Sequence, residues 1–197
     1  AFLTIWNYEE HWHGDAIAAV LAAHGTDAGR ARVGRVRGEK GPSERLRPLA
    51  FMAASALVPD ISAVHMTWGA INEWTTQAGY ARLVTKTDHP VLRDLLGRIM
   101  KQEGRHIDFY ASEATRRLAD SRTNQRVTRF ALRHFWSPVG TGVRPRAEVE
   151  FVVRYLFEGE EGRSMADRID RRVDRLPGLA GLRLVGRARA AAGVAAS

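Results

Sequence analysis

The distribution of apolar and polar residues along the chain indicates amphipathic helices from end to end. A first helix is predicted to end at His24-Gly25, because glycine tolerates the left-handed conformation that closes a helix C-terminus. Two long segments without a helix breaker follow at residues 60–87 and 88–120, each opening on an aspartate that can cap it. Pro90 fits the first turn of the later helix, where its missing N–H removes no hydrogen bond.

Shorter segments fill the remainder of the chain, and no stretch of useful length alternates with the period of two that a β-strand requires. Residues 26–46 are rich in Gly and Arg and lack apolar periodicity, so they are interpreted as a loop or partly disordered crossover. The pattern therefore predicts an all-α protein, with further helices at residues 47–58, 123–138, 147–159, 164–176 and after Pro177-Gly178.

Two Glu-x-x-His sequences lie within this helical pattern, from Glu10 to His13 and from Glu103 to His106. Residues i and i+3 share one helix face and lie about 4.5 Å apart along the axis. Each sequence can therefore offer a carboxylate oxygen and an imidazole nitrogen to one metal centre. A single Glu-x-x-His arises often by chance. Two of them together with an inward-facing Glu73 match the ligand pattern of a di-iron carboxylate site in a ferritin-like bundle.

The spacing of these residues supports one shared site. Glu73 lies fifteen residues before Asp88, and Glu103 lies thirteen residues after Pro90. In an antiparallel hairpin that turns between the two long helices, both carboxylates reach similar heights. Their neighbours on the helix face are mainly apolar, where an unpaired carboxylate is costly and a bound cation removes that cost. A solvated face, or ion pairs with the abundant Arg, is the alternative.

The other histidines have no partner at ligand spacing. They are interpreted as surface or core residues: His11, His24, His65, His89 and His134.

Length and composition fit a single globular domain. The 197 residues are enough for one substantial core. The absence of Cys excludes disulfides, Cys-zinc sites and thiol nucleophiles, and it fits a reducing cytoplasm. No apolar run approaches the ~20 residues that span a bilayer, which argues against a membrane-bound enzyme.

The net charge of +8 points to an acidic partner. Nucleic acid is the general expectation for a basic chain, but no zinc finger, helix-turn-helix or aromatic-interleaved basic patch is present. A basic surface would also steer an acidic protein by complementary charge. Residues 29–40 and the C-terminal arginines are the candidate docking surface, and scattered surface Arg is the alternative.

Several segments resemble the soluble acyl-[acyl-carrier-protein] desaturases. Residues 6–15 (WNYEEHWHGD), 72–83 (NEWTTQAGYARL) and 101–110 (KQEGRHIDFY) are similar to that family's W-x-x-E-E-N-R-H-G-D, Q-E-x-A-T and D-E-K-R-H-E stretches. Residues 173–192 are similar to its C-terminal tail. The resemblance implies a ferritin-like helical bundle with additional C-terminal helices, as one domain over residues 1–197.

Carried over by position, the resemblance implies five of the family's six metal ligands on this chain. Glu10 and Glu103 would bridge two iron ions. His13 and His106 would each bind one ion, and Glu73 would be a terminal ligand.

Two further residues correspond to family positions near the cluster. Trp6 matches a tryptophan beside it, and Thr76 matches a threonine at the oxygen-binding face. Core packing is the alternative role for Trp6, and a hydrogen bond to its own helix is the alternative for Thr76.

Two departures from the family pattern bear on function. The acid that precedes the second motif's glutamate is Gln102 here, which puts the family's electron or proton route in question. The sixth ligand, a Glu on a preceding helix, is absent, so we expect an upstream segment that this sequence lacks. The acidic cluster of Glu158, Glu160 and Glu161 is the reserve, although its neighbouring glycines favour a solvated loop.

The resemblance implies an oxygen-dependent enzyme that introduces a double bond into a fatty acyl chain held on acyl carrier protein. Two Fe ions cycling between Fe2+ and Fe3+, a ferredoxin-type electron donor and a cytoplasmic homodimer pairing through the first two bundle helices are expected with it. The alternative is a non-catalytic or differently reacting ferritin-like metal-binding protein, either an oxygenase or a paralogue that binds the carrier protein. Gln102 and the missing ligand favour that alternative, whereas the five retained ligands and Thr76 favour the enzyme.

Overall fold

The computed structural model describes residues 2–26, 55, 58 and 60–194. Across these residues the protein is an all-α helical bundle without a β-strand, which confirms the predicted fold class. The predicted loop at 26–46 and the helix at 47–58 lie almost wholly outside the described residues. The helices are α1 (Phe2–Ala23), α4 (Ile61–Lys86), α5 (Pro90–Ala119), α6 (Arg122–Phe135), α7 (Arg146–Phe157), α8 (Gly159–Asp174) and α9 (Leu184–Ala191).

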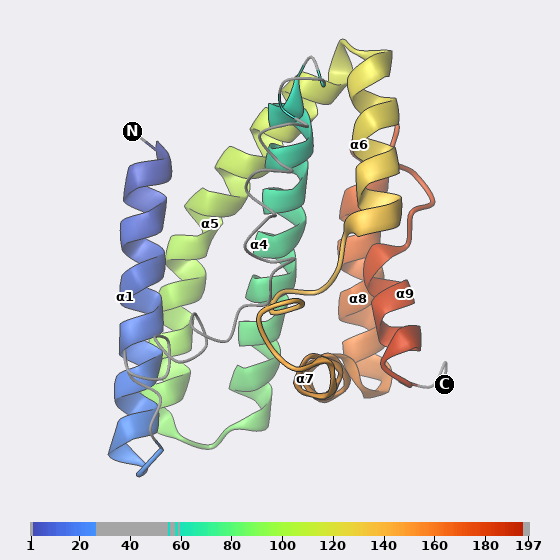
Figure 1. Ribbon diagram of the computed structural model, residues 1–197. Helices are drawn as coiled ribbons and strands as arrows, with labels where there is room; N and C mark the ends of the chain where they lie inside the picture. The colour runs from blue at the N-terminus through green and yellow to red at the C-terminus, as the bar shows by residue number, and fades with distance from the viewer. Residues whose placement is uncertain (1, 27–54, 56–57, 59, 195–197) are drawn as a thin grey trace.

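The antiparallel hairpin of α4 and α5 forms the centre of the bundle (Figure 1). Helix α1 packs on one side against α5, while α6, α7 and α8 pack against α4, and α9 closes over α7 and α8. Fully buried apolar side chains fill the space between these helices, among them Ile71, Leu118, Leu132 and Val173. None of the helices described here is both long and apolar enough to cross a bilayer.

The helix ends follow the predicted signals only in part. Asp60 stands at the N-cap of α4, but its side chain caps no N–H group because it pairs with Arg117. Gly25 adopts a φ of 74° after the last turn of α1, as predicted. The cap of α5 is His89 rather than Asp88, because the extended backbone of His89 aims its Nδ1 at the Leu92 N–H, 3.1 Å away. Since Nδ1 accepts that bond, the neutral ring carries its proton on Nε2. That nitrogen lies 2.9 Å from His24 Nε2, so it donates there and ties the end of α1 to the start of α5.

Helices α4 and α5 pack closely at Gly69. A Cβ added at Gly69 would lie 2.4 Å from two ring carbons of Tyr110. The Tyr110 ring is 2 % exposed and packs edge-on against the rings of Phe2 and Trp6 from α1. The missing side chain at Gly69 therefore leaves room for the ring on which the first turns of α1 rest.

We predict that Gly69→Ala lowers the free energy of unfolding by about 1–3 kcal/mol, because the buried Tyr110 ring must move. Gly97→Ala is the matched control, since Gly97 lies on α5 with no atom within 4 Å of an added Cβ. That change should raise the free energy by up to about 1 kcal/mol through helix propensity. Urea denaturation followed by circular dichroism measures both, and equal effects of the two variants would contradict the close approach.

Candidate metal centre

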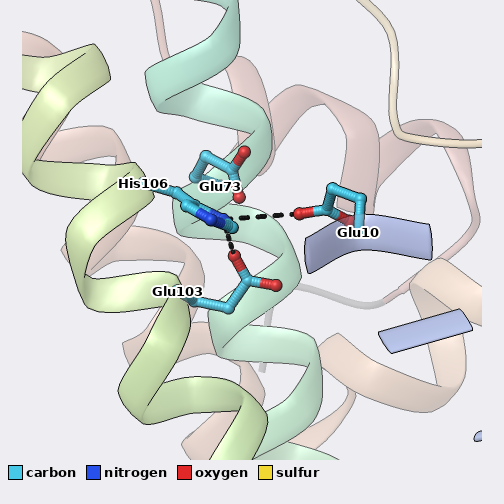
Figure 2. Close-up of side chains that lie close together, drawn as sticks. All are labelled: Glu10, Glu73, Glu103 and His106. Atoms are coloured by element: carbon cyan, nitrogen blue, oxygen red, sulfur yellow. Dashed lines mark hydrogen bonds and ion pairs between the residues drawn. The ribbon is translucent and has the colours of Figure 1, made fainter. Parts of the chain in front are cut away.

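Three helices bring four ligand-type side chains to one point of the bundle. Glu10 comes from α1, Glu73 from α4, and Glu103 and His106 come from α5 (Figure 2). One ligand atom from each lies within 4.8 Å of those of the other three. Three of these residues are buried and Glu10 is half-buried. We call this group the carboxylate cluster.

The two histidines of the motifs present the same ring nitrogen to Glu103. His106 Nδ1 lies 2.7 Å from Glu103 Oε2 and 3.4 Å from Glu10 Oε1. His13 Nδ1 lies 3.2 Å from the other oxygen, Glu103 Oε1. The carboxylate of Glu103 therefore lies between two imidazoles that come from different helices.

The contact between His13 and Glu103 is not a well-formed hydrogen bond. His13 Nδ1 and Glu103 Oε1 are both buried and lie 3.2 Å apart, but neither makes a hydrogen bond of good geometry to the other or to any other group. Buried polar atoms are nearly always paired in folded proteins, because leaving one unpaired costs its full desolvation energy. A cation bound between the two atoms would satisfy both. The residues therefore fit a metal ion at this position.

The outer nitrogens of the two histidines are held by a reciprocal pair of contacts. His106 Nε2 lies 2.8 Å from Glu9 Oε2, and His13 Nε2 lies 2.8 Å from Gln102 Oε1. In each case the residue that precedes a motif glutamate holds the histidine of the opposite helix. Histidines that bind metals commonly donate their outer N–H to such an acceptor, which fixes the ring and its tautomer.

Glu9 was not predicted as part of the site. The sequence did hold a clue: Glu9 directly precedes the first motif glutamate, just as Gln102 directly precedes the second. Gln102 keeps the orienting hydrogen bond although its amide carries no charge.

Trp6 contacts the cluster directly and does more than fill the core. Its Nε1–H donates to Glu73 Oε1 at 2.9 Å. Burial, followed by the nearby charge of Glu103, raises the pKa of Glu73 to about 7. Burial is also the main cause that raises the pKa of Glu10. For Glu103, burial acts in the same direction, but the polar contacts with the two histidines outweigh it and lower the pKa.

Thr76 lies one turn beyond Glu73 and lines an apolar pocket. Within the described residues its hydroxyl makes no hydrogen bond, whereas the neighbouring Thr75 bonds back to the Asn72 carbonyl at 2.8 Å. The alternative of a bond from Thr76 to its own helix is therefore contradicted. The pocket has a cavity volume of about 220 Å³ and lies between α4, α7 and α9. Its lining includes Thr76, Tyr80, Leu83, Val153 and Leu156.

Tyr80 relates this pocket to the cluster. Burial, followed by the charges of Glu103, Glu10 and Glu73, raises the pKa of Tyr80, so its phenol stays neutral. The side chain that lines the apolar pocket is thus within the electrostatic influence of the three carboxylates.

The reserve acids do not supply a sixth ligand. Glu158 pairs with Lys86, Glu161 pairs with Arg82, and Glu160 is exposed on α8. Arg82 lies nine residues past Glu73, which is about 13 Å further along the helix axis. The predicted loop around these acids was also wrong: α8 begins at Gly159, and acids in a first turn are stabilised by the helix dipole.

The cluster as a whole offers carboxylate oxygens and imidazole nitrogens. This combination suits iron, manganese or zinc, and it matches the donors of two-metal carboxylate sites in helical bundles. The predicted ligands Glu10, Glu73, Glu103 and His106 lie together, and His13 lies beside them on Glu103. Metal binding by these five residues stays a prediction.

No protein-family model matches the chain, and no curated protein or solved structure matches it either. The functional interpretation therefore rests on the geometry of the cluster and on the resemblance of the sequence segments that form it.

We predict that the metal-free protein loses stability as the pH rises from about 5 to 8. Folding raises the pKa of Glu73 from 4.5 to about 7, so within this window the folded state holds a proton that the unfolded state has released. The pKa values of Glu10 and His13 are also raised, so both groups lower the stability of the folded state as the pH rises. The lowered pKa of Glu103 matters only at more acidic pH. Burial lowers the pKa of His65, which opposes the effect in the acidic half of the window, but the three raised groups outnumber it.

Denaturation in EDTA at several pH values measures this effect. Glu73→Gln should reduce the change in the free energy of unfolding between pH 5 and 8 by on the order of 1 kcal/mol, because it removes one titrating group. A pH dependence identical to that of the wild type would show that Glu73 is not buried in an anionic cluster.

Proposed function

We propose that the carboxylate cluster binds two iron ions and that the protein is an oxygen-dependent oxidoreductase acting on an apolar chain. The observation that supports it best is the position of Glu103. Its two oxygens lie 3.2 Å and 2.7 Å from the Nδ1 atoms of two different histidines. A carboxylate that bridges two metal ions, each with one imidazole ligand, requires this arrangement.

The ligand roles that we propose are those that the resemblance implies. Glu103 and Glu10 would lie between the ions, while His13 and His106 would each bind one ion. Glu73 would be a terminal ligand, oriented by the hydrogen bond from Trp6. Bound cations would offset the repulsion among three carboxylates and the burial that raises the pKa of Glu73 and Glu10.

The substrate that we propose is a fatty acyl chain carried on acyl carrier protein. The apolar pocket would take the chain, because its wall is formed by aliphatic and aromatic side chains and by Thr76 on the same helix as Glu73. When bound, a pair of iron ions supplies the oxygen-dependent oxidation, and the protein supplies position and a water-poor environment. Loss of two hydrogens from the chain, with two electrons from a ferredoxin-type donor and two protons from solvent, reduces one O2 to two waters.

The remaining partners belong to the same proposal. A net charge of +8 suits an acidic carrier protein and an acidic electron donor. A second copy of the chain could cover the apolar outer face of α1, where Ile5, Tyr8 and Trp12 are each more than half exposed. A cytoplasmic location accords with the lack of Cys.

A metal-binding protein without turnover is the second candidate. Gln102 favours it, because the amide orients His13 but cannot carry a charge or accept a proton as a carboxylate would. An oxygenase on the same ligands belongs to this alternative, since ligands alone do not determine the reaction.

We predict that anaerobic titration with Fe2+ gives two ions per chain and raises the melting temperature, since metal binds only the folded state. Glu103→Ala should lose both ions, whereas His106→Ala should lose at least one. His134→Ala is the control, because His134 is exposed on α6. Binding by Glu103→Ala that equals the wild type would contradict a shared bridging carboxylate.

We predict a two-hydrogen mass loss from carrier-bound acyl chains when the iron-loaded protein is given ferredoxin, reductase and O2. Glu73→Ala or His106→Ala should abolish the product, because each removes a ligand that no neighbour can replace. Thr76→Val should lower the yield and leave iron content unchanged, since Thr76 lines the pocket without contacting the ligands. Complete iron loading without product across chain lengths would favour the non-catalytic alternative.

A further inference from the structure

Four arginines line a second pocket on the opposite flank of α4. Arg168, Arg171, Arg172 and Arg175 follow the spacing i, i+3, i+4 and i+7, so they share one face at the C-terminal end of α8. All four side chains are exposed. The row extends about 10 Å along the helix axis. We call this cavity the arginine pocket.

These four positive charges are not compensated within the described part of the chain. None of the four arginines forms an ion pair there, whereas Arg82, Arg117 and Arg144 each pair with a carboxylate. Like charges at this helical spacing repel one another. A row of them that the fold leaves unpaired is therefore expected to face an anion.

Two acids on α8, Asp170 and Asp174, make hydrogen bonds away from the row. Asp170 is buried and accepts hydrogen bonds from the Val185 and Gly186 N–H groups at the start of α9. Asp174 accepts from the Gly181 N–H. These contacts hold both carboxylates toward the C-terminal segment.

Apart from the arginines and Gln77, the side chains that line the arginine pocket are apolar. Trp74 is 5 % exposed, and Arg172 lies over its ring with the guanidinium carbon 5.8 Å from the ring centroid. Met100 and Met165 also belong to this apolar floor. The cavity volume of about 450 Å³ lies within the range of roughly 300–1,000 Å³ found for small-molecule sites. A concave site of this size suits a small ligand better than the convex surface of a protein.

We propose that the arginine pocket binds a small molecule bearing a diphosphate group. Guanidinium groups bind phosphate oxygens through paired N–H bonds, and four of them in a row can contact two adjacent phosphates. The apolar floor offers a surface for the organic part of such an ester. On α4, Trp74, Ala78 and Ala81 face this pocket, while Thr76 and Leu83 face the apolar pocket on the other side. The inference is thus independent of the proposed oxidation.

Inorganic pyrophosphate is the probe, titrated calorimetrically into metal-free protein in EDTA so that iron cannot bind it. We expect saturable binding of one pyrophosphate per chain. Arg168→Gln and Arg172→Gln should each weaken it about tenfold or more, the usual effect of losing a charged hydrogen bond. Arg163→Gln is the matched control. Arg163 lies on α8 outside the pocket, and its substitution removes the same charge.

Three results would overturn the proposal. They are no binding at millimolar pyrophosphate, equal weakening by Arg163→Gln, and binding of an acidic carrier protein without its prosthetic arm where pyrophosphate does not bind. Melting curves of the variants establish that they are folded. Because metal is excluded, loss of pyrophosphate binding and loss of iron binding are separate outcomes.

Discussion

The attachment of α1 to the bundle depends on Glu103, a fully buried carboxylate whose oxygens face histidines of two different helices. His13 is the only fully buried residue described on α1, and the half-buried rings of Phe2 and Trp6 add aromatic packing against Tyr110. Trp6 and Glu9 add polar contacts to α4 and α5. A network of buried carboxylates and imidazoles is stable only when its charges are matched. Metal binding and the docking of α1 are therefore expected to be coupled.

The reciprocal contacts of Glu9 and Gln102 give the site an approximate two-fold arrangement with one chemical difference. Each histidine presents Nδ1 to Glu103 and is held at Nε2 by the opposite helix, but the acceptor is a carboxylate for His106 and an amide for His13. A carboxylate acceptor makes an imidazole a stronger electron donor than an amide does. The two metal positions would therefore differ in affinity even with similar ligands.

The sequence was sufficient to predict the helices that carry the site and four side chains that meet in it, because helical periodicity and residue counting determine which positions face inward at one height. It was not sufficient for contacts that depend on how neighbouring helices are rotated and offset. Two examples are the contact between Glu9 and His106 and the hydrogen bond between His24 and His89. The start of α8 was missed because Gly159 has a positive φ, which can open a helix as well as form a loop. The capping role of His89 was missed because Asp88 is the commoner residue type at that position.

Anomalous diffraction from crystals grown with Fe2+ under anaerobic conditions tests the di-iron site most directly. Two peaks should flank the Glu103 carboxylate, one next to His13 Nδ1 and the other next to His106 Nδ1. A single peak away from Glu103, or no peak between α1, α4 and α5 in protein that retains iron, would contradict a di-iron centre at the carboxylate cluster.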